Sequence, residues 1–218
     1  MRQLILDLLP EAPPSFENFV AGSNAETLTG LAAWLAPANR ESLFFIWGDA
    51  GAGKSHLLQA CQAPYCDARL DPELEGLDPA TDFCAVDNVE ALGESGQIVL
   101  FNLINRLRAS AGRLLAAASV PPLRLILRED LRTRLGSGLL YRLQPLSDIE
   151  KLTTLAELAS ARGLVLPPEA FNYFFSRAPR DMRSLMALLV AIDRYSPEQK
   201  RPITLPLLRE VLQTSLNL

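Results

Sequence analysis

Residues 43–55 join an apolar run to a glycine-rich turn, and this join constrains the chain more than any other feature. The run Leu43–Trp47 leads into Gly48, and four residues later comes Gly53-Lys54-Ser55. Strand, turn and helix in this order form a phosphate-binding loop. Its glycines let backbone N–H groups face a pyrophosphate, its lysine reaches the β- and γ-phosphates, and its serine ligands Mg²⁺. A plain glycine-rich turn before a helix is the alternative, but every fixed position is filled. We predict a nucleotide site made by Gly48, Asp49, Ala50, Gly51, Ala52, Gly53, Lys54, Ser55 and His56.

The composition fits a globular cytoplasmic protein. Of 218 residues 49% are hydrophobic, enough for one large domain or slightly more. The net charge of -4 argues against a nucleic-acid footprint over the whole surface, but not against a local basic patch. Cys61, Cys66 and Cys84 lack paired metal spacing, so we expect buried reduced thiols. No run is long enough for a secretory core or a membrane span, so we expect no membrane contact.

Short apolar runs alternate with helical patterns in the first two thirds of the chain, which indicates an α/β fold with a parallel sheet. Asn24 is a candidate cap for a helix whose apolar face would hold Leu28, Leu31, Ala32 and Leu35. A further helix is marked by apolar positions between 100 and 107. The expected strands are Leu43–Trp47, Tyr65–Leu70, Phe83–Val86, Arg113–Ser119 and Leu139–Leu143.

The pattern becomes helical only from Ser147 onward, which places a domain boundary there. Apolar spacing predicts helices around residues 152–156, 170–175, 182–189 and 205–212. We therefore expect an extended tail over 1–14, an α/β nucleotide-binding domain over 15–146, and a small all-α domain over 147–218.

Asp87 ends an apolar strand about thirty residues after the loop. A carboxylate at this place holds Mg²⁺ through water in P-loop proteins, whereas a surface-turn aspartate is the alternative. Asn88 follows, and an amide is a poor base for activating water. Glu90 is close enough to substitute, but the sequence does not give its direction. Intrinsic ATP turnover is therefore in doubt.

These motifs together resemble the AAA+ core of the bacterial replication initiator DnaA, from about Ser15 to the C-terminus. The resemblance rests on the loop, the Asp87 strand, Pro121-Pro122 after the fourth strand, and the segments SFENFVAGSNAE, EDLRTRLGSGL and RDMRSL. It implies a P-loop AAA+ parallel sheet flanked by helices and followed by a helical lid. No helix-turn-helix pattern follows the lid, so we expect no direct sequence-specific DNA binding.

The resemblance also implies roles for two arginines. Arg134 matches the arginine finger, which reaches ATP held by a neighbouring subunit, although spacing alone would favour a surface arginine. Arg183 matches the sensor-2 arginine that contacts the bound nucleotide, with Arg180 as its competitor. Ser119 departs from the family, which has an acidic or amide sensor residue there.

The N-terminal tail has the QLxLxL form of a peptide that docks on the replicative sliding clamp. Gln3, Leu4, Leu6 and Leu8 would make the contact, although an ordinary leading strand is the alternative for an isolated hexamer. Beside a DnaA-like core, this tail is similar to that of the Hda-type regulatory inactivators of DnaA. The implied partners are DnaA and the β subunit (sliding clamp) of DNA polymerase III. The implied cofactors are ADP or ATP with Mg²⁺. The resemblance is also compatible with a homo-oligomer.

Two other classes of function stay open. An autonomous AAA+ ATPase, such as a helicase loader, would turn over ATP without partners; Asn88 and Ser119 count against it. A P-loop kinase for small molecules fits the length, but an all-helical last third and a clamp-like tail have no place in it.

Overall fold

A parallel sheet forms the centre of the first of two compact units. The protein's structure, a computed structural model, describes residues 13–164, 166, 169–170 and 181–199. Residues Pro14–Pro145 make one unit, and the described residues from Leu146 onward belong to the other. Residues 1–12 of the predicted tail, including Gln3, Leu4, Leu6 and Leu8, lie outside the described residues. The same holds for the helix predicted around 205–212 and for most of the one around 170–175.

The sheet has five strands in the order β2-β3-β4-β1-β5, and every neighbouring pair is parallel. This confirms the α/β fold class. Buried Leu, Ile and Ala side chains fill the central strands because helices cover both faces of a parallel sheet. The strands are β1 (Leu43–Trp47), β2 (Tyr65–Asp67), β3 (Phe83–Asp87), β4 (Arg113–Ala118) and β5 (Leu139–Arg142).

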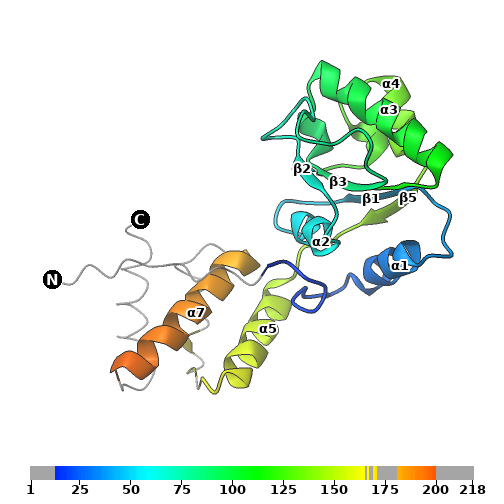
Figure 1. The fold of residues 1–218 in the computed structure, drawn as a ribbon. Helices are drawn as coiled ribbons and strands as arrows, with labels where there is room; N and C mark the ends of the chain where they lie inside the picture. Colours follow the sequence, from blue (N-terminus) through cyan, green and yellow to red (C-terminus); the bar gives the residue numbers. More distant parts are fainter. Residues whose placement is uncertain (1–12, 165, 167–168, 171–180, 200–218) are drawn as a thin grey trace. The chain divides into compact units, whose positions relative to one another are not determined.

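Two helices lie on each face of the sheet (Figure 1). Helices α3 (Glu94–Ser110) and α4 (Glu129–Leu135) pack against one face, where Leu100, Leu107 and Leu131 are fully buried. Helices α1 (Ala25–Leu35) and α2 (Lys54–Ala60) pack against the other. Two short 3₁₀ turns, η1 (Val89–Ala91) and η2 (Pro122–Arg124), follow β3 and β4.

Helix α1 begins where the sequence predicts, but two details of that prediction are wrong. Asn24 makes no side-chain cap bond; its side chain instead exchanges two hydrogen bonds with the backbone of Gln144, at 2.9 and 2.7 Å. The buried face is formed by Thr27, Leu31 and Trp34, whereas Ala32 is exposed. Trp34 follows Leu31 by three residues and so lies on the same face of the helix, a position that the predicted apolar face omitted. Its ring packs beside Phe44 of β1, with centroids 5.4 Å apart.

The second predicted strand is also shorter than expected. β2 ends at Asp67, and residues 68–70 form a turn in which the Leu70 amide donates to the Asp67 carbonyl at 2.9 Å. The Asp67 carboxylate accepts the Arg69 amide at 3.0 Å, a typical aspartate turn that stops the strand.

The second unit contains helices α5 (Asp148–Ala161) and α7 (Met182–Gln199). A complete capping box starts α5: the Glu150 amide donates to Ser147 Oγ at 3.2 Å, and the Ser147 amide donates to Glu150 Oε2 at 2.7 Å. Leu155, Leu185 and Ile192 are buried in one small apolar core that joins the two helices.

All three cysteines are free, with Cys66 and Cys84 buried and Cys61 half-buried. Burial raises the pKa of Cys61 and Cys84 to about 12, so these thiols stay protonated at neutral pH. Among the described residues, no helix has the length and apolar character needed to cross a membrane.

Candidate functional site

The carboxyl ends of the strands meet at one edge of the sheet, where ligands bind in open α/β folds. Trp47 of β1 pairs in register with Ala118 of β4, and Asp87 of β3 pairs with Asp67 of β2. The glycine loop starts directly after Trp47, so it lies at this edge between the ends of β4 and β5. The Gly48 amide donates to the Ala118 carbonyl at 3.3 Å, which ties the loop to β4.

The backbone of the loop needs its glycines. Gly48 has φ +155°, and a Cβ built there would lie 2.1 Å from the carbonyl oxygen of Leu143. Gly53 has φ +97°, and a Cβ there would meet the ring of Phe19 at 2.8 Å. Positive φ values turn consecutive amides toward one side, which is how such loops bind anions. The loop therefore has the backbone that a pyrophosphate requires.

Lys54 stands at the start of α2 and turns back over the loop. Its ammonium donates to the carbonyls of Gly48 and Asp49, at 2.8 and 3.0 Å. Burial lowers the pKa of Lys54, while the charges of Asp87 and Glu90 act in the opposite direction. The ammonium is thus held in the half-buried interior of the loop, where a phosphate could replace the carbonyls as its acceptor.

Asp87 is a fully buried carboxylate at the end of β3. Its Oδ1 accepts the Asn88 amide at 2.8 Å and its Oδ2 accepts the Tyr65 hydroxyl at 2.9 Å. Ser55, in the first turn of α2, is half-buried. A hydroxyl and a carboxylate are hard oxygen donors, and Mg²⁺ beside nucleotides takes one or two such groups plus phosphates and water. These residues fit a Mg²⁺ that bridges to a nucleotide.

The two residues that bear on hydrolysis are both engaged by the protein. Asn88 has a left-handed backbone, φ 54° and ψ 45°, and its Nδ2 donates to Asp67 Oδ1 at 2.8 Å. Glu90, whose direction the sequence does not give, accepts the backbone amide of Ser119 at 2.9 Å. Ser119 itself is exposed. In the place of a sensor side chain, the structure therefore has a backbone contact to Glu90.

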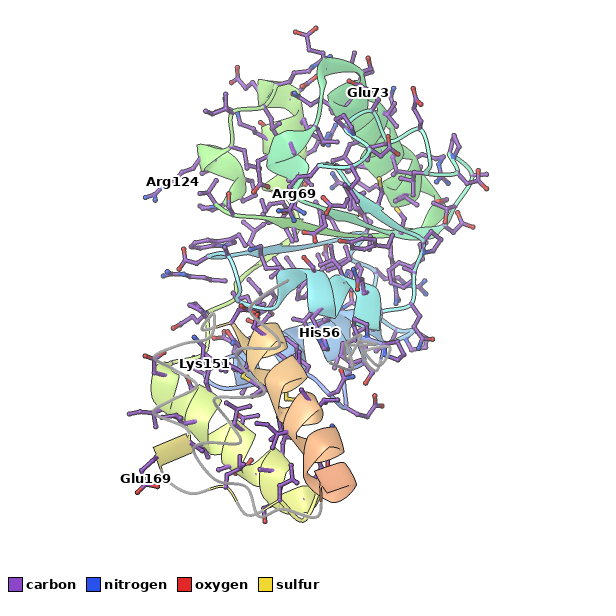
Figure 2. All side chains as sticks on the ribbon, turned by 90° about the vertical axis from the view of Figure 1, so that its left-hand side faces the viewer. His56, Arg69, Glu73, Arg124, Lys151 and Glu169 are labelled. Atoms are coloured by element: carbon purple, nitrogen blue, oxygen red, sulfur yellow. The ribbon has the colours of Figure 1, made fainter. Side chains whose placement is uncertain are left out.

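His56 lies on α2, across the sheet from Glu73, which contacts α3 (Figure 2). Its Nε2 is 3.0 Å from the carbonyl oxygen of Ser15, and its ring meets Phe19 edge-on with centroids 5.4 Å apart. The segment from Ser15 to Phe19 therefore lies over the start of α2 and over Gly53. No local pattern in the sequence points to Phe19 or to Tyr65, because both reach the site through distant contacts.

Arg134 lies in the last turn of α4 and is half-buried. Its guanidinium carbon is 5.9 Å from the centre of the Phe101 ring on α3, within the range of a cation–π contact. Arg132, in the same helix, instead buries its Nε. The two arginines of the LRTRL segment therefore differ: Arg134 lies on the Phe101 ring, whereas the Nε of Arg132 is buried. Arg183 lies in α7, but its side chain and the whole of Arg180 are outside the described residues.

Two family models match the chain in different places. The model of the bacterial DnaA ATPase domain matches residues 12–75, and that of the Hda lid domain matches residues 148–212. The chain is therefore similar to DnaA in its nucleotide-binding part and to Hda in its helical part. The first match covers α1, β1, the glycine loop, α2 and β2, and the second covers α5 and α7.

Several solved structures share this fold. Domain III of the replication initiation protein DnaA from Thermotoga maritima is 22% identical, with a TM-score of 0.72 over 94% of this chain and 97% of that one. AMPPCP-bound DnaA from Aquifex aeolicus is 21% identical, with a TM-score of 0.69 over 85% of this chain and 66% of that one. The Holliday junction branch migration motor RuvB from Thermotoga maritima is 16% identical, with a TM-score of 0.63 over 92% and 72%. At these identities the three structures show a common fold and no more.

Proposed function

We propose that this protein is a regulator of replication initiation that acts on DnaA. It holds an adenine nucleotide at Gly48–Ser55 and presents Arg134 to ATP bound by DnaA, which stimulates hydrolysis of that ATP. The main support is the half-buried Arg134 on α4, held against Phe101, in a chain that matches both a DnaA ATPase model and an Hda lid model.

A guanidinium suits this role for physical reasons. It is always charged, and its planar set of N–H donors can bridge phosphate oxygens as negative charge spreads over them in the transition state. Stacking on Phe101 limits the side chain's rotamers without neutralising it, so less entropy is lost when it enters a partner's site.

The protein's own nucleotide has a different role in this proposal. Asn88 and Glu90 both have partners inside the chain, so no described side chain next to Asp87 is free to act as a base. A bound nucleotide would then persist and stabilise the fold, and we propose ADP, with Mg²⁺ at Ser55 and through water at Asp87.

The tail completes the proposal. Leu4, Leu6 and Leu8 would enter an apolar groove of the DNA polymerase III sliding clamp, and Gln3 would hydrogen-bond beside them. Each leucine contributes on the order of 1.5–3 kcal/mol when fully buried, so the segment can supply micromolar affinity. The clamp would bring the protein to DNA without sequence-specific DNA contacts of its own.

An autonomous ATPase is the second candidate, and one observation favours it. Glu90 is exposed, and its charge acts on Lys54. A carboxylate at this place could orient a water if it left the Ser119 amide. That candidate predicts turnover by the protein alone.

The test measures hydrolysis of radiolabelled ATP loaded on DnaA, mixed with clamp-loaded DNA and this protein. Arg134→Ala should lower the stimulated rate by roughly 10³–10⁵, as loss of an arginine finger does. Arg134→Lys should also be poor, because an ammonium cannot bridge two oxygens in the same way. Arg108→Ala is the matched control, because Arg108 is an exposed arginine in the last turn of α3.

Each outcome separates the parts of the proposal. A variant with residues 1–8 removed should lose clamp binding and keep nucleotide binding. Unchanged clamp binding would show that the tail is not the clamp-binding segment. Near-normal stimulation by Arg134→Ala would rule out the finger. Turnover by the wild-type protein alone that disappears in Arg134→Ala would favour a self-assembling ATPase.

A further inference from the structure

Tyr65 is the one side chain that holds the Asp87 carboxylate from another strand among the described residues. The hydroxyl donates to Asp87 Oδ2 at 2.9 Å, while the other oxygen is held by the amide of the next residue. The hydrogen bond from the Asn88 backbone amide is local, and it does not depend on any other side chain. The orientation of the buried carboxylate about its last bond therefore depends on Tyr65.

The sheet register brings the two groups together. β2 and β3 are parallel, with Tyr65 opposite Ala85 and Asp67 opposite Asp87. A tyrosine is long enough to pass from its own register position to the end of the next strand, and its ring packs in the core on the α1–α2 face. Gln59 of α2 also interacts with Tyr65, and it lies one turn along the helix from Ser55. The phenol thus lies between the carboxylate and the helix that carries the proposed Mg²⁺ ligand.

A hydrogen bond of this kind does not prevent a carboxylate from meeting a metal-bound water. Two carboxylate oxygens offer about four lone-pair positions, and only two are used by Tyr65 and Asn88. The remaining positions are fixed in direction because the group cannot rotate. Outer hydrogen bonds that fix a ligand in this way typically change metal affinity 10–100-fold when they are removed.

We propose that Tyr65 is a positioning residue that aims Asp87 at the water shell of a nucleotide-bound Mg²⁺. The proposal rests on the nucleotide site of the preceding subsection and adds a residue on a strand that the motif does not include. It requires Tyr65 to act only when Mg²⁺ is present, because its hydroxyl donates to the carboxylate that would face the metal's water shell.

The experiment compares ADP binding with Mg²⁺ and with EDTA, measured by titration calorimetry on nucleotide-stripped protein. The wild type should bind ADP in both conditions and more tightly with Mg²⁺. Tyr65→Phe keeps the ring in the core and should lose about 10-fold or more of the Mg²⁺-dependent gain while keeping the affinity measured in EDTA. Tyr141→Phe is the matched control, since Tyr141 of β5 stacks on Phe44 with ring centroids 4.8 Å apart and should change neither value.

A double mutant tests whether Tyr65 acts through Asp87. Asp87→Asn should lose the Mg²⁺-dependent gain by itself, and adding Tyr65→Phe should cost nothing more. An equal loss in Mg²⁺ and EDTA would make Tyr65 a purely structural residue and overturn the proposal, as would no loss in either condition. ADP binding by the wild type that is insensitive to Mg²⁺ would overturn it while leaving the nucleotide site intact. No ADP binding in either condition would overturn both.

Discussion

The loop after β1 and the segment after β3 lie at the same edge of the sheet but differ in how their polar groups are used. In the loop, the glycines and Lys54 are arranged around a space for phosphate, and Lys54 is held only by the loop's own carbonyls. After β3, each polar side chain has a partner from elsewhere in the chain: Asp87 has Tyr65, Asn88 has Asp67, and Glu90 has the Ser119 amide.

This difference separates binding from turnover. Carbonyl oxygens that hold Lys54 can be exchanged for phosphate oxygens at little cost, because the ammonium keeps charge-assisted bonds throughout. The contacts of Asp87 and Asn88 are different, since both residues are buried and breaking their hydrogen bonds would leave a buried polar group without its partner. The comparison therefore supports the proposed function, in which this protein holds a nucleotide without hydrolysing it and hydrolysis takes place at the ATP site of a partner.

The largest effect is expected from Lys54→Ala. The change removes the only described cation that reaches into the loop, and two phosphate contacts at about 1.5–3 kcal/mol each correspond to a loss of affinity of about 100-fold or more. Calorimetry with ADP gives the affinity. Thermal melts should show that ADP raises the Tm of the wild type but not that of the variant. If neither ADP nor ATP raises the Tm of the nucleotide-stripped wild type, the loop is not a nucleotide site.

The sequence predicts this loop well because its requirements are local. Strand, glycines and lysine are consecutive, and the motif's spacing follows from the backbone that it must adopt. The five strands are also recognisable as short apolar runs. The fourth and fifth were predicted one residue too long, and β2 three residues too long because the aspartate turn at Asp67 was missed.

The segment after β3 shows why the rest could not be predicted. Asp87 could be chosen from its place at a strand end, but its Tyr65 partner is 22 residues away and depends on the register of two strands. Glu90 reaches a backbone amide 29 residues away, and Asn24 meets Gln144 across 120 residues. Contacts of this kind leave no periodic pattern in the sequence, so only the fold reveals them.

A smaller effect should come from Asn88→Gly, which tests whether the segment after β3 is held as tightly as its contacts suggest. Glycine keeps the left-handed backbone and removes the bond to Asp67, so the free energy of unfolding at pH 7 should fall by about 1–2 kcal/mol. Burial, the largest single influence, raises the pKa of Asp67, but hydrogen bonds from the Arg69 amide and from Asn88 outweigh it and hold the pKa below its usual value.

The pH dependence of this effect has a definite sign. A carboxylate with a lowered pKa in the folded state stabilises the fold above its unfolded pKa of about 3.9, and this contribution disappears as pH falls through the folded pKa. The difference between wild type and Asn88→Gly should therefore shrink between pH 5 and pH 3, as measured by urea unfolding. Ala111→Gly is the control, since Ala111 also has a left-handed backbone, at φ 58°. A pH-independent difference for Asn88→Gly would mean that the bond to Asp67 contributes nothing.

The smallest effect, and the sharpest test of the comparison, is expected from Glu90→Gln. Glutamine keeps an oxygen that can accept the Ser119 amide, so the contact at 2.9 Å and the fold should survive while the exposed carboxylate that follows Asp87 is lost. If the segment after β3 does not catalyse hydrolysis, the ATP turnover of the protein alone should be equally low in wild type and variant, and stimulation of DnaA-bound ATP hydrolysis should be unchanged. A general base typically contributes 10²–10⁴-fold. A fall of that size in the protein's own turnover would identify Glu90 as a base that leaves the Ser119 amide during the reaction. The loop after β1 and the segment after β3 would then form one ATPase site.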